Sequence, residues 1–310
     1  MKKKVIDRNH KKYEEAINRI TTLFPGFPTS ISISDWFNIE KSSQVQRECE
    51  KMIILLHYKE AELGWCLYDY GVKNQRISEI IKMIRKEITK IDIVSDSNIY
   101  CLDSYVNNLI ENEDIENMIN DFELSQGDKK KIERAFYFFK EGDFYTASLY
   151  LTALIDMQNI KMEMQQHNRF KDGDKTVQCW KSYIRIVDYC FPDILVNGKI
   201  RNNDITNGNT RREKFEELVD NINYEKYPSY STKVPMVFGI GYSLLNFFDN
   251  TDWDEYETVR PAYFNRNWLM HGMYDLNDIE RIDCIKLFFL LYSINLLFSE
   301  IRMKQMMEVE

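Results

Sequence analysis

Apolar residues recur at intervals of three and four along most of the chain, and strictly alternating segments are scarce. The first spacing is that of an amphipathic helix, whereas alternation would indicate strands. Eleven glycines and six prolines in 310 residues also leave few tight turns. The pattern therefore predicts an all-α protein in which more than half of the residues are helical.

Three helices are expected in the first 120 residues. The first spans about Ser43 to Tyr70, because Ser43 and Gln46 form a capping signature ahead of an apolar stripe. The second begins near Gln75. Its apolar face carries six isoleucines: Ile77, Ile80, Ile81, Ile84, Ile88 and Ile91. The third covers about Asn98 to Ile110.

The composition changes in the stretch from Glu111 to Lys131, where scattered apolar positions among acidic residues give way to lysines. A change of this kind predicts a boundary between two units. The first is a helical N-terminal unit, residues 1–120, whose role the sequence does not reveal. The second is a helical domain, residues 121–310, with a polar insertion near 191–232 that is rich in asparagine and glycine.

The second unit is expected to begin with two consecutive helices. A helix through Ile132 and Phe139 stops at "EGD", and Asp143 caps the next helix. One side of that next helix carries an apolar stripe: Phe144, Ala147, Leu151, Leu154 and Ile155. Its other side carries Tyr145, Leu149 and Ala153, so we expect the helix to be buried nearly all round.

Asp156 lies on this second side of the helix, close in angle to Tyr145 and Leu149. A carboxylate in a buried helix is costly unless it is paired or lines a polar cavity. Asp156 is therefore interpreted in two ways, as one partner of a structural salt bridge or as a residue at the edge of a functional site.

The segment "FNRNWLMHG" places an arginine, an asparagine and a histidine within six positions. Pro261 predicts a short helix that begins near Ala262 and ends at Gly272, followed by a long helix from about Asn277. On the short helix Asn267 and His271 share a face, while Arg266 points about 100° away from Asn267. A histidine beside a helix stop also has a purely structural explanation, since it can satisfy a terminal carbonyl.

Charge and cysteine content narrow the class of protein. A net charge of −8 argues against non-specific coating of nucleic acid, although a local cationic site is compatible with it. The six cysteines have no CxxC spacing and no cleavable signal precedes them, so we expect buried, reduced thiols in a cytoplasmic protein. The apolar run Leu287 to Phe298 falls short of the ~20 residues that span a bilayer, and is expected to be a core helix without a membrane partner.

Two segments together resemble a known family. Arg266 and His271, with Asn267 directly after the arginine and Gly272 directly after the histidine, resemble the R-x4-H motif of the HEPN superfamily (higher eukaryotes and prokaryotes nucleotide-binding). The upstream helix from Lys140 to Asp156 resembles the early helix of Abi-like members, which leads from a "G-D/N-Y/F" start to an acidic residue. The resemblance covers about Asp128 to Arg302, and residues 1–120 lie outside it.

The resemblance implies a metal-independent endoribonuclease that needs no cofactor. In such an enzyme the ribose 2′-hydroxyl attacks the neighbouring phosphorus, His271 moves protons and Arg266 neutralises the phosphorane oxygens. Asn267 would orient the imidazole or an RNA phosphate, and Asp156 would lie at the site edge. The implied partners are RNA, a second copy in a homodimer, and an antitoxin or regulatory protein, in a setting of phage defence or toxin control.

Two other interpretations stay open. The chain is alternatively a HEPN-like module that binds a nucleotide or a partner without cleaving anything. It is alternatively a purely structural helical protein, which would be favoured if Arg266 and His271 were buried and bonded within one subunit.

Overall fold

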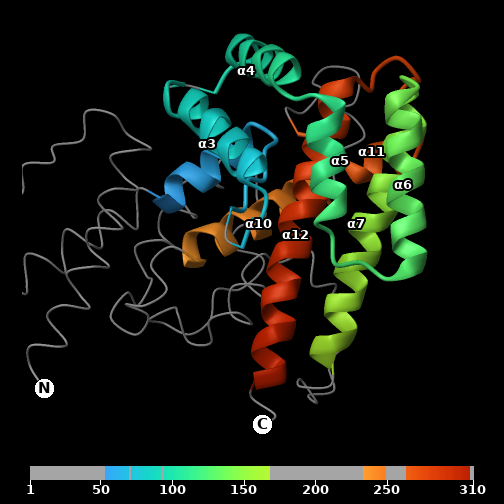
Figure 1. The fold of residues 1–310 in the computed structure, drawn as a ribbon. Helices are drawn as coiled ribbons and strands as arrows, with labels where there is room; N and C mark the ends of the chain where they lie inside the picture. The colour runs from blue at the N-terminus through green and yellow to red at the C-terminus, as the bar shows by residue number, and fades with distance from the viewer. Residues whose placement is uncertain (1–52, 70, 92–93, 168–232, 249–262, 308–310) are drawn as a thin grey trace, which may run out of the picture.

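The structure is a computed structural model that describes residues 53–69, 71–91, 94–167, 233–248 and 263–307 (Figure 1). Within these ranges 74% of the residues are helical and none is in a strand. The expectation of an all-α protein with more than half of its residues in helices is confirmed for this part of the chain.

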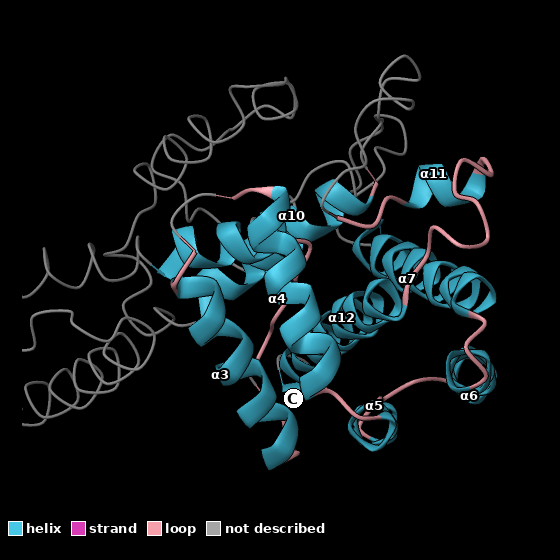
Figure 2. Ribbon diagram, turned by 90° about the horizontal axis from the view of Figure 1, so that it is seen from above, coloured by secondary structure: helices cyan, strands magenta, loops and turns pink. Residues whose placement is uncertain are grey.

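A group of long helices forms one side of the molecule. Helix α12 (Arg281–Met307) lies in the middle and packs against α7 (Phe144–His167) and α10 (Lys233–Phe247). Helix α6 (Gln126–Lys140) packs along α7, and its Phe139 also meets Phe288 of α12 with ring centroids 5.5 Å apart (Figures 1 and 2). The three-residue turn between α6 and α7 contains Gly142, whose φ of 80° permits the reversal.

Three further helices, two of which lie against α12, form another side of the molecule. Helix α3 (Gln75–Thr89) contacts α4 (Asp96–Leu109) and α5 (Asn112–Asn120), and both α4 and α5 reach α12. The five isoleucines of α3 from Ile77 to Ile88 are all 0% exposed. The predicted positions of α3 and α4 are therefore confirmed to within two residues.

One hydrophobic core extends through all of these helices. It includes Ile80 of α3, Ile115 of α5, Leu151 of α7 and Phe288 of α12, each 0% exposed. Helix α5 forms within the acidic stretch, because Ile115 and Met118 are buried and the Glu111 N–H donates to Asp114. The core thus continues across the predicted boundary, and the division into two units stays a prediction. The proposed insertion at 191–232 lies outside the described residues.

Helix ends show where the sequence was interpreted correctly and where it was not. Asp143 caps α7 as predicted, since its Oδ1 accepts from the Thr146 N–H at 3.0 Å. The first helix is described from residue 53, with its predicted cap at Ser43 outside the described residues, and it ends at residue 62 rather than near Tyr70. The early end follows from Gly64, which has a φ of 81°.

The prediction that α7 is buried nearly all round is wrong. Leu149 is 37% exposed, Ala153 is also exposed, and Tyr145 and Asp156 are half-buried. Helices α6 and α12 cover the face that carries Ala147 and Leu151, whereas Leu149 and Ala153 on the opposite side are exposed to solvent. Asp156 is therefore within reach of solvent.

Helix α12 is a core helix, as predicted, although it begins at Arg281 rather than near Asn277. Its start is set by Asp283, whose Oδ2 accepts from the Glu280 N–H at 2.9 Å. In the described ranges, one segment is long and apolar enough to cross a membrane, Arg281–Ser299, but 83% of its apolar window is buried inside the protein. Its apolar surface is thus explained by packing.

The cysteines are free thiols wherever the structure describes them. Cys66 and Cys284 are buried, as expected, but Cys101 is exposed, so the expectation of a buried thiol is wrong there. Cys101 lies on the outer side of α4, whose buried residues are Leu102 and Val106. Cys49, Cys179 and Cys190 lie outside the described residues.

Candidate functional site

The "RNWLM" segment forms α11 (Arg266–Met270), which begins at a buried asparagine cap. The Asn265 side chain accepts from the Asn267 N–H at 2.8 Å and from the Trp268 N–H at 3.2 Å. Residues 263–265 are not helical, so the helix starts later than predicted, and Ala262 lies outside the described residues. The asparagine determines the start because its side chain satisfies amide groups that have no partner in the first turn.

Gly272 stops α11, as predicted, although the last helical residue is Met270. Gly272 has a φ of 68°, its N–H donates to the Leu269 carbonyl at 3.1 Å, and the Met273 N–H donates to the Trp268 carbonyl at 2.9 Å. This pair of bonds is a Schellman motif, which closes the carboxyl end of a helix. His271 is the last residue before the glycine, so it terminates the helix rather than lying inside it.

Aromatic packing fixes α11 to the core. Trp268 is 4% exposed, and its ring lies 5.8 Å from the ring of Tyr274 between centroids. Tyr274 also stacks on Phe264 at 5.4 Å, and its hydroxyl accepts from the Asn265 N–H at 3.3 Å. The backbone that carries the polar side chains of the motif is therefore held at both ends and along its inner face.

Three of the predicted site residues come together at the start of α11. The Arg266 Nε and Nη2 donate to the Asp156 Oδ2 at 3.1 and 3.0 Å, across 110 residues of sequence. The Arg266 Nη1 donates to the Asn267 Oδ1 at 3.1 Å. Asn267 in turn donates from Nδ2 to the Phe248 carbonyl at 3.3 Å. The guanidinium is thus oriented by two side chains from two helices.

The Arg266 and Asp156 side chains are 30% and 25% exposed. The interpretation of Asp156 as a partner in a salt bridge is confirmed, and its place at the edge of a functional site stays a prediction. The contacts above use three of the five N–H groups of the guanidinium, which leaves two for a ligand. Because Asp156 balances the charge of Arg266, an anion would be attracted here mainly by these directed hydrogen bonds.

His271 lies at the opposite end of α11, about 7.5 Å along the helix axis from Arg266. Its side chain is exposed. The purely structural interpretation expected both residues to be buried and bonded within one subunit. Both residues have interaction partners within the subunit, but neither is buried, so that condition is met only in part.

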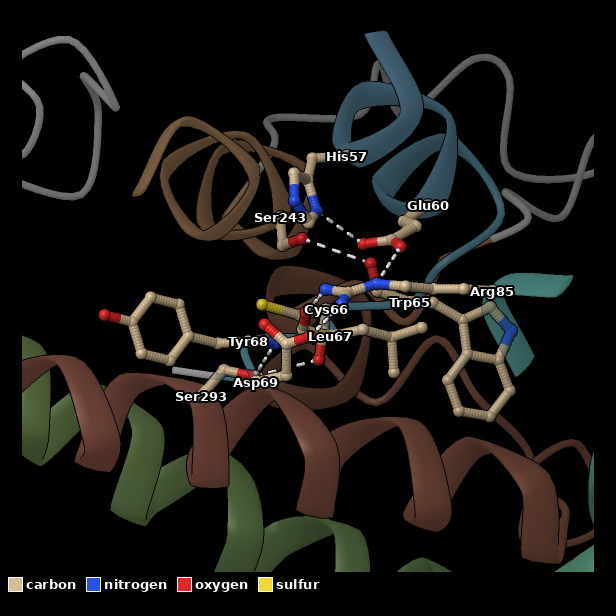
Figure 3. Close-up of polar contacts among 10 residues, drawn as sticks. All are labelled: His57, Glu60, Trp65, Cys66, Leu67, Tyr68, Asp69, Arg85, Ser243 and Ser293. Atoms are coloured by element: carbon tan, nitrogen blue, oxygen red, sulfur yellow. Dashed lines mark hydrogen bonds and ion pairs between the residues drawn. The ribbon is translucent and has the colours of Figure 1, made fainter. Parts of the chain in front are cut away.

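A second polar cluster was missed by the sequence interpretation (Figure 3). Arg85 of α3 is 1% exposed. Its Nε donates to the Glu60 Oε1 at 2.7 Å, and its Nη1 donates to the Asp69 Oδ2 at 2.5 Å. Its Nη2 donates to the Leu67 carbonyl. The Glu60 Oε2 lies 2.7 Å from the Nδ1 of His57. The signal was available, because Arg85 is one turn from Ile81 and from Ile88 and hence lies on the apolar face of α3.

The electrostatics of this buried cluster are those of a compensated ion network. Burial alone would raise the pKa of the Glu60 carboxyl, but the charges and hydrogen bonds of Arg85 and His57 hold it below its ordinary value. Burial would lower the pKa of the Arg85 guanidinium, but the carboxylates of Glu60 and Asp69 raise it. Since the Arg85 and Glu60 side chains are each 2% exposed, the cluster holds the chain together rather than meeting a ligand.

The non-helical segment of residues 65–69, which contributes Leu67 and Asp69 to this cluster, is also bonded to helices α10 and α12. The Tyr68 N–H donates to the Ser293 Oγ at 3.1 Å, and the Ser293 hydroxyl donates to the Cys66 carbonyl at 2.9 Å. The Ser243 hydroxyl of α10 donates to the Trp65 carbonyl at 3.4 Å. These bonds satisfy backbone groups that have no strand or helix partner, as buried amides require.

Comparison of the chain with protein-family models, with curated proteins and with solved structures finds no match. Among the described residues, no group of three or more His, Cys, Asp or Glu side chains is arranged to hold a metal ion. The functional argument therefore rests on the geometry around α11.

Proposed function

We propose that this protein is a cytoplasmic, metal-independent endoribonuclease of HEPN type, with Arg266, Asn267 and His271 of α11 as its catalytic residues. The observation that carries the proposal is the placement of Arg266 and His271 at opposite ends of a helix that is capped at both ends, with both side chains reached by solvent. Asp156, from a separate helix, orients the guanidinium.

The residue types fit 2′-hydroxyl attack on phosphorus. His271 would take the proton of the 2′-hydroxyl and return a proton to the departing 5′-oxygen, an exchange that histidine performs near neutral pH. Arg266 would donate its two remaining N–H groups to the phosphorane oxygens. The products would be a 2′,3′-cyclic phosphate and a 5′-hydroxyl, so DNA would not be cleaved.

A homodimer with α11 near the twofold axis would bring two arginines and two histidines to one composite site. An exposed apolar side chain within the motif supports such a contact: Met270 of α11 is 54% exposed. Light scattering at micromolar concentration tests it, and a strict monomer would count heavily against a composite site. An antitoxin or regulatory partner and a setting of phage defence or toxin control belong to the same proposal.

The direct test compares RNA cleavage by the wild type and by variants of α11, with and without EDTA. His271→Ala should lose about two to four orders of magnitude of activity, and Arg266→Ala a comparable amount. Arg266→Lys should recover only part, because the forked geometry is lost, and Asn267→Ala should cost less. Lys82→Ala, which removes an exposed cation from α3, is the matched control and should cleave as the wild type does.

The alternative is a HEPN-like module that binds a nucleotide or a partner without catalysis. The observation that favours it is the Asp156 carboxylate, which already neutralises Arg266. The two functions separate in one experiment: a binding module retains ligand but leaves RNA intact. Wild type that cleaves no RNA as a purified dimer, or His271→Ala that cleaves equally well, would refute the nuclease and leave the binding module.

A further inference from the structure

The outer face of α6 carries a concentration of positive charge in an acidic chain. Five of its fifteen residues are cationic and two are acidic, whereas the whole chain has a net charge of −8. Lys130 and Arg134 lie one turn apart, and Tyr137 and Phe138 follow on the same side of the helix. All four side chains are exposed or half-buried, and Glu141 limits the basic surface at its far end.

Aromatic rings and a guanidinium are assembled at this place. The Arg134 Cζ lies 5.3 Å from the ring centroid of Tyr137 and 5.0 Å from that of Phe138. Phe138 stacks on Tyr150 of α7, with centroids 5.9 Å apart and planes at 20°. Tyr137 is 48% exposed although α6 already buries Ile132, Phe136 and Phe139 in the core, so its ring is not needed to fill the interior.

We infer that Arg134, Tyr137, Phe138 and Tyr150 form a stacking platform for single-stranded RNA, and this inference rests on the proposed function. Unpaired bases present flat faces that stack on aromatic rings and on arginine, while Lys130 and Arg134 neutralise the phosphates between them. A duplex hides those faces within its own stack, so the fitting partner is a single strand. The combination of exposed rings with local cations fits single-stranded RNA, which offers both base faces and phosphates, better than a purely apolar protein surface.

The platform is continuous with the proposed catalytic site through the uncovered side of α7. Tyr150 precedes Asp156 by six residues, a rise of about 9 Å and a rotation of about 120° around the helix. The exposed residues Leu149 and Ala153 lie in the sector between them. Figure 2 shows α7 between α6 on one side and α11 on the other. A strand held on α6 would therefore cross α7 toward Arg266.

The test measures binding separately from cleavage. Fluorescein-labelled oligo-dT of twelve nucleotides, which has no 2′-hydroxyl to react, is titrated with the full chain at low salt, and binding is followed by fluorescence anisotropy. Oligo-U is titrated in parallel with the His271→Ala chain. Tyr137→Ala should weaken both complexes about five-fold or more, whereas Tyr137→Phe should retain the affinity. Tyr100→Ala removes an aromatic side chain of α4 that is 75% exposed, and should bind as the wild type does.

Arg134→Ala supplies a second readout, because it should lower the slope of log affinity against log salt by about 0.7. The inference is overturned if the wild type does not bind oligo-dT, or if Tyr137→Ala binds within two-fold of it. It is equally overturned if Tyr137→Ala changes the oligomeric mass and leaves the affinity unaltered, which would identify an interface between copies. If the wild type cleaves RNA but Tyr137→Ala binds the oligonucleotides as tightly as the wild type, the platform alone is refuted. If Tyr137→Ala binds more weakly but the wild type cleaves no RNA, the ribonuclease alone is refuted.

Discussion

Replacing Arg85 by methionine should destabilise the protein severely. Methionine fills a similar volume but donates no hydrogen bond, so it leaves the Glu60 carboxylate, at 2% side-chain exposure, without its cation. It also leaves the Leu67 carbonyl without a donor. Breaking a buried ion pair from one side costs about 3–5 kcal/mol. That is a large part of the roughly 5–15 kcal/mol that stabilises a typical domain.

Urea unfolding followed by circular dichroism measures this loss as a lower midpoint at unchanged slope. The matched control is Arg76→Met on the same helix, which breaks the pair with Asp114 at 3.1 Å. Because the Arg76 side chain is 44% exposed, and Asp114, at 8% exposure, still accepts from the Glu111 N–H, its removal should cost about 1 kcal/mol. If Arg85→Met costs no more than Arg76→Met, the buried cluster does not stabilise the fold as argued.

The same cluster predicts a dependence on pH with a definite sign. In the wild type the pKa of Glu60 is held below the ordinary 4.5, so its contribution to stability is present above pH 4.5 and lost as the pH falls through the lower folded value. Without Arg85, burial should raise that pKa instead, and the penalty should shrink as Glu60 is protonated. The stability gap between wild type and Arg85→Met should therefore be larger at pH 7.5 than at pH 5, and a gap that widens on acidification would contradict the mechanism.

Other predictions concern single sites. A Cβ at Gly239 would lie 2.9 Å from the Cβ of His57, so Gly239→Ala should cost about 1–3 kcal/mol in thermal unfolding, and an unchanged midpoint would contradict that close contact. Asn265→Ala removes the cap of α11 and should cost about 1–2 kcal/mol and lower RNA cleavage, whereas Asn265→Ser should retain most of both. A thiol reagent should modify exposed Cys101 of the native protein rapidly, but Cys66 only after unfolding, because Cys66 is buried and burial raises its pKa to about 12. Mass spectrometry locates the modified thiols, and equal rates at the two cysteines would refute the prediction.

Structural features that depend only on residues close together in the sequence could be predicted. The isoleucine stripe of α3, the Asp143 cap and the Gly272 stop each depend on residues within one or two turns, and the structure contains all three. Asn265 is a local signal too, and it competes with Pro261, which predicts a start near Ala262. The capping asparagine was the stronger signal, because it supplies an acceptor where two amide groups need one.

Contacts between distant segments could not be predicted in the same way. The pairing of Arg266 with Asp156 spans 110 residues, and periodicity placed each on its own helix without relating the two helices. The exposed side of α7 was misjudged for the same reason, because an apolar helix face is buried only if another element covers it. The burial of Arg85 was not predicted from apolar periodicity, because Arg85 is a charged residue at a position on the apolar face of α3.

The bonds from Ser293 to Cys66 and Tyr68 have a consequence for biosynthesis. Tyr68 and Ser293 are separated by 225 residues, so the ribosome, at roughly 5–20 residues per second, needs on the order of ten to forty-five seconds to produce the second partner after the first. During that interval the backbone groups of residues 65–69 must remain hydrated or be shielded by a chaperone. Closing so long a loop is entropically slow, and the emergence of α12 is therefore the event that commits the nascent chain to its native arrangement.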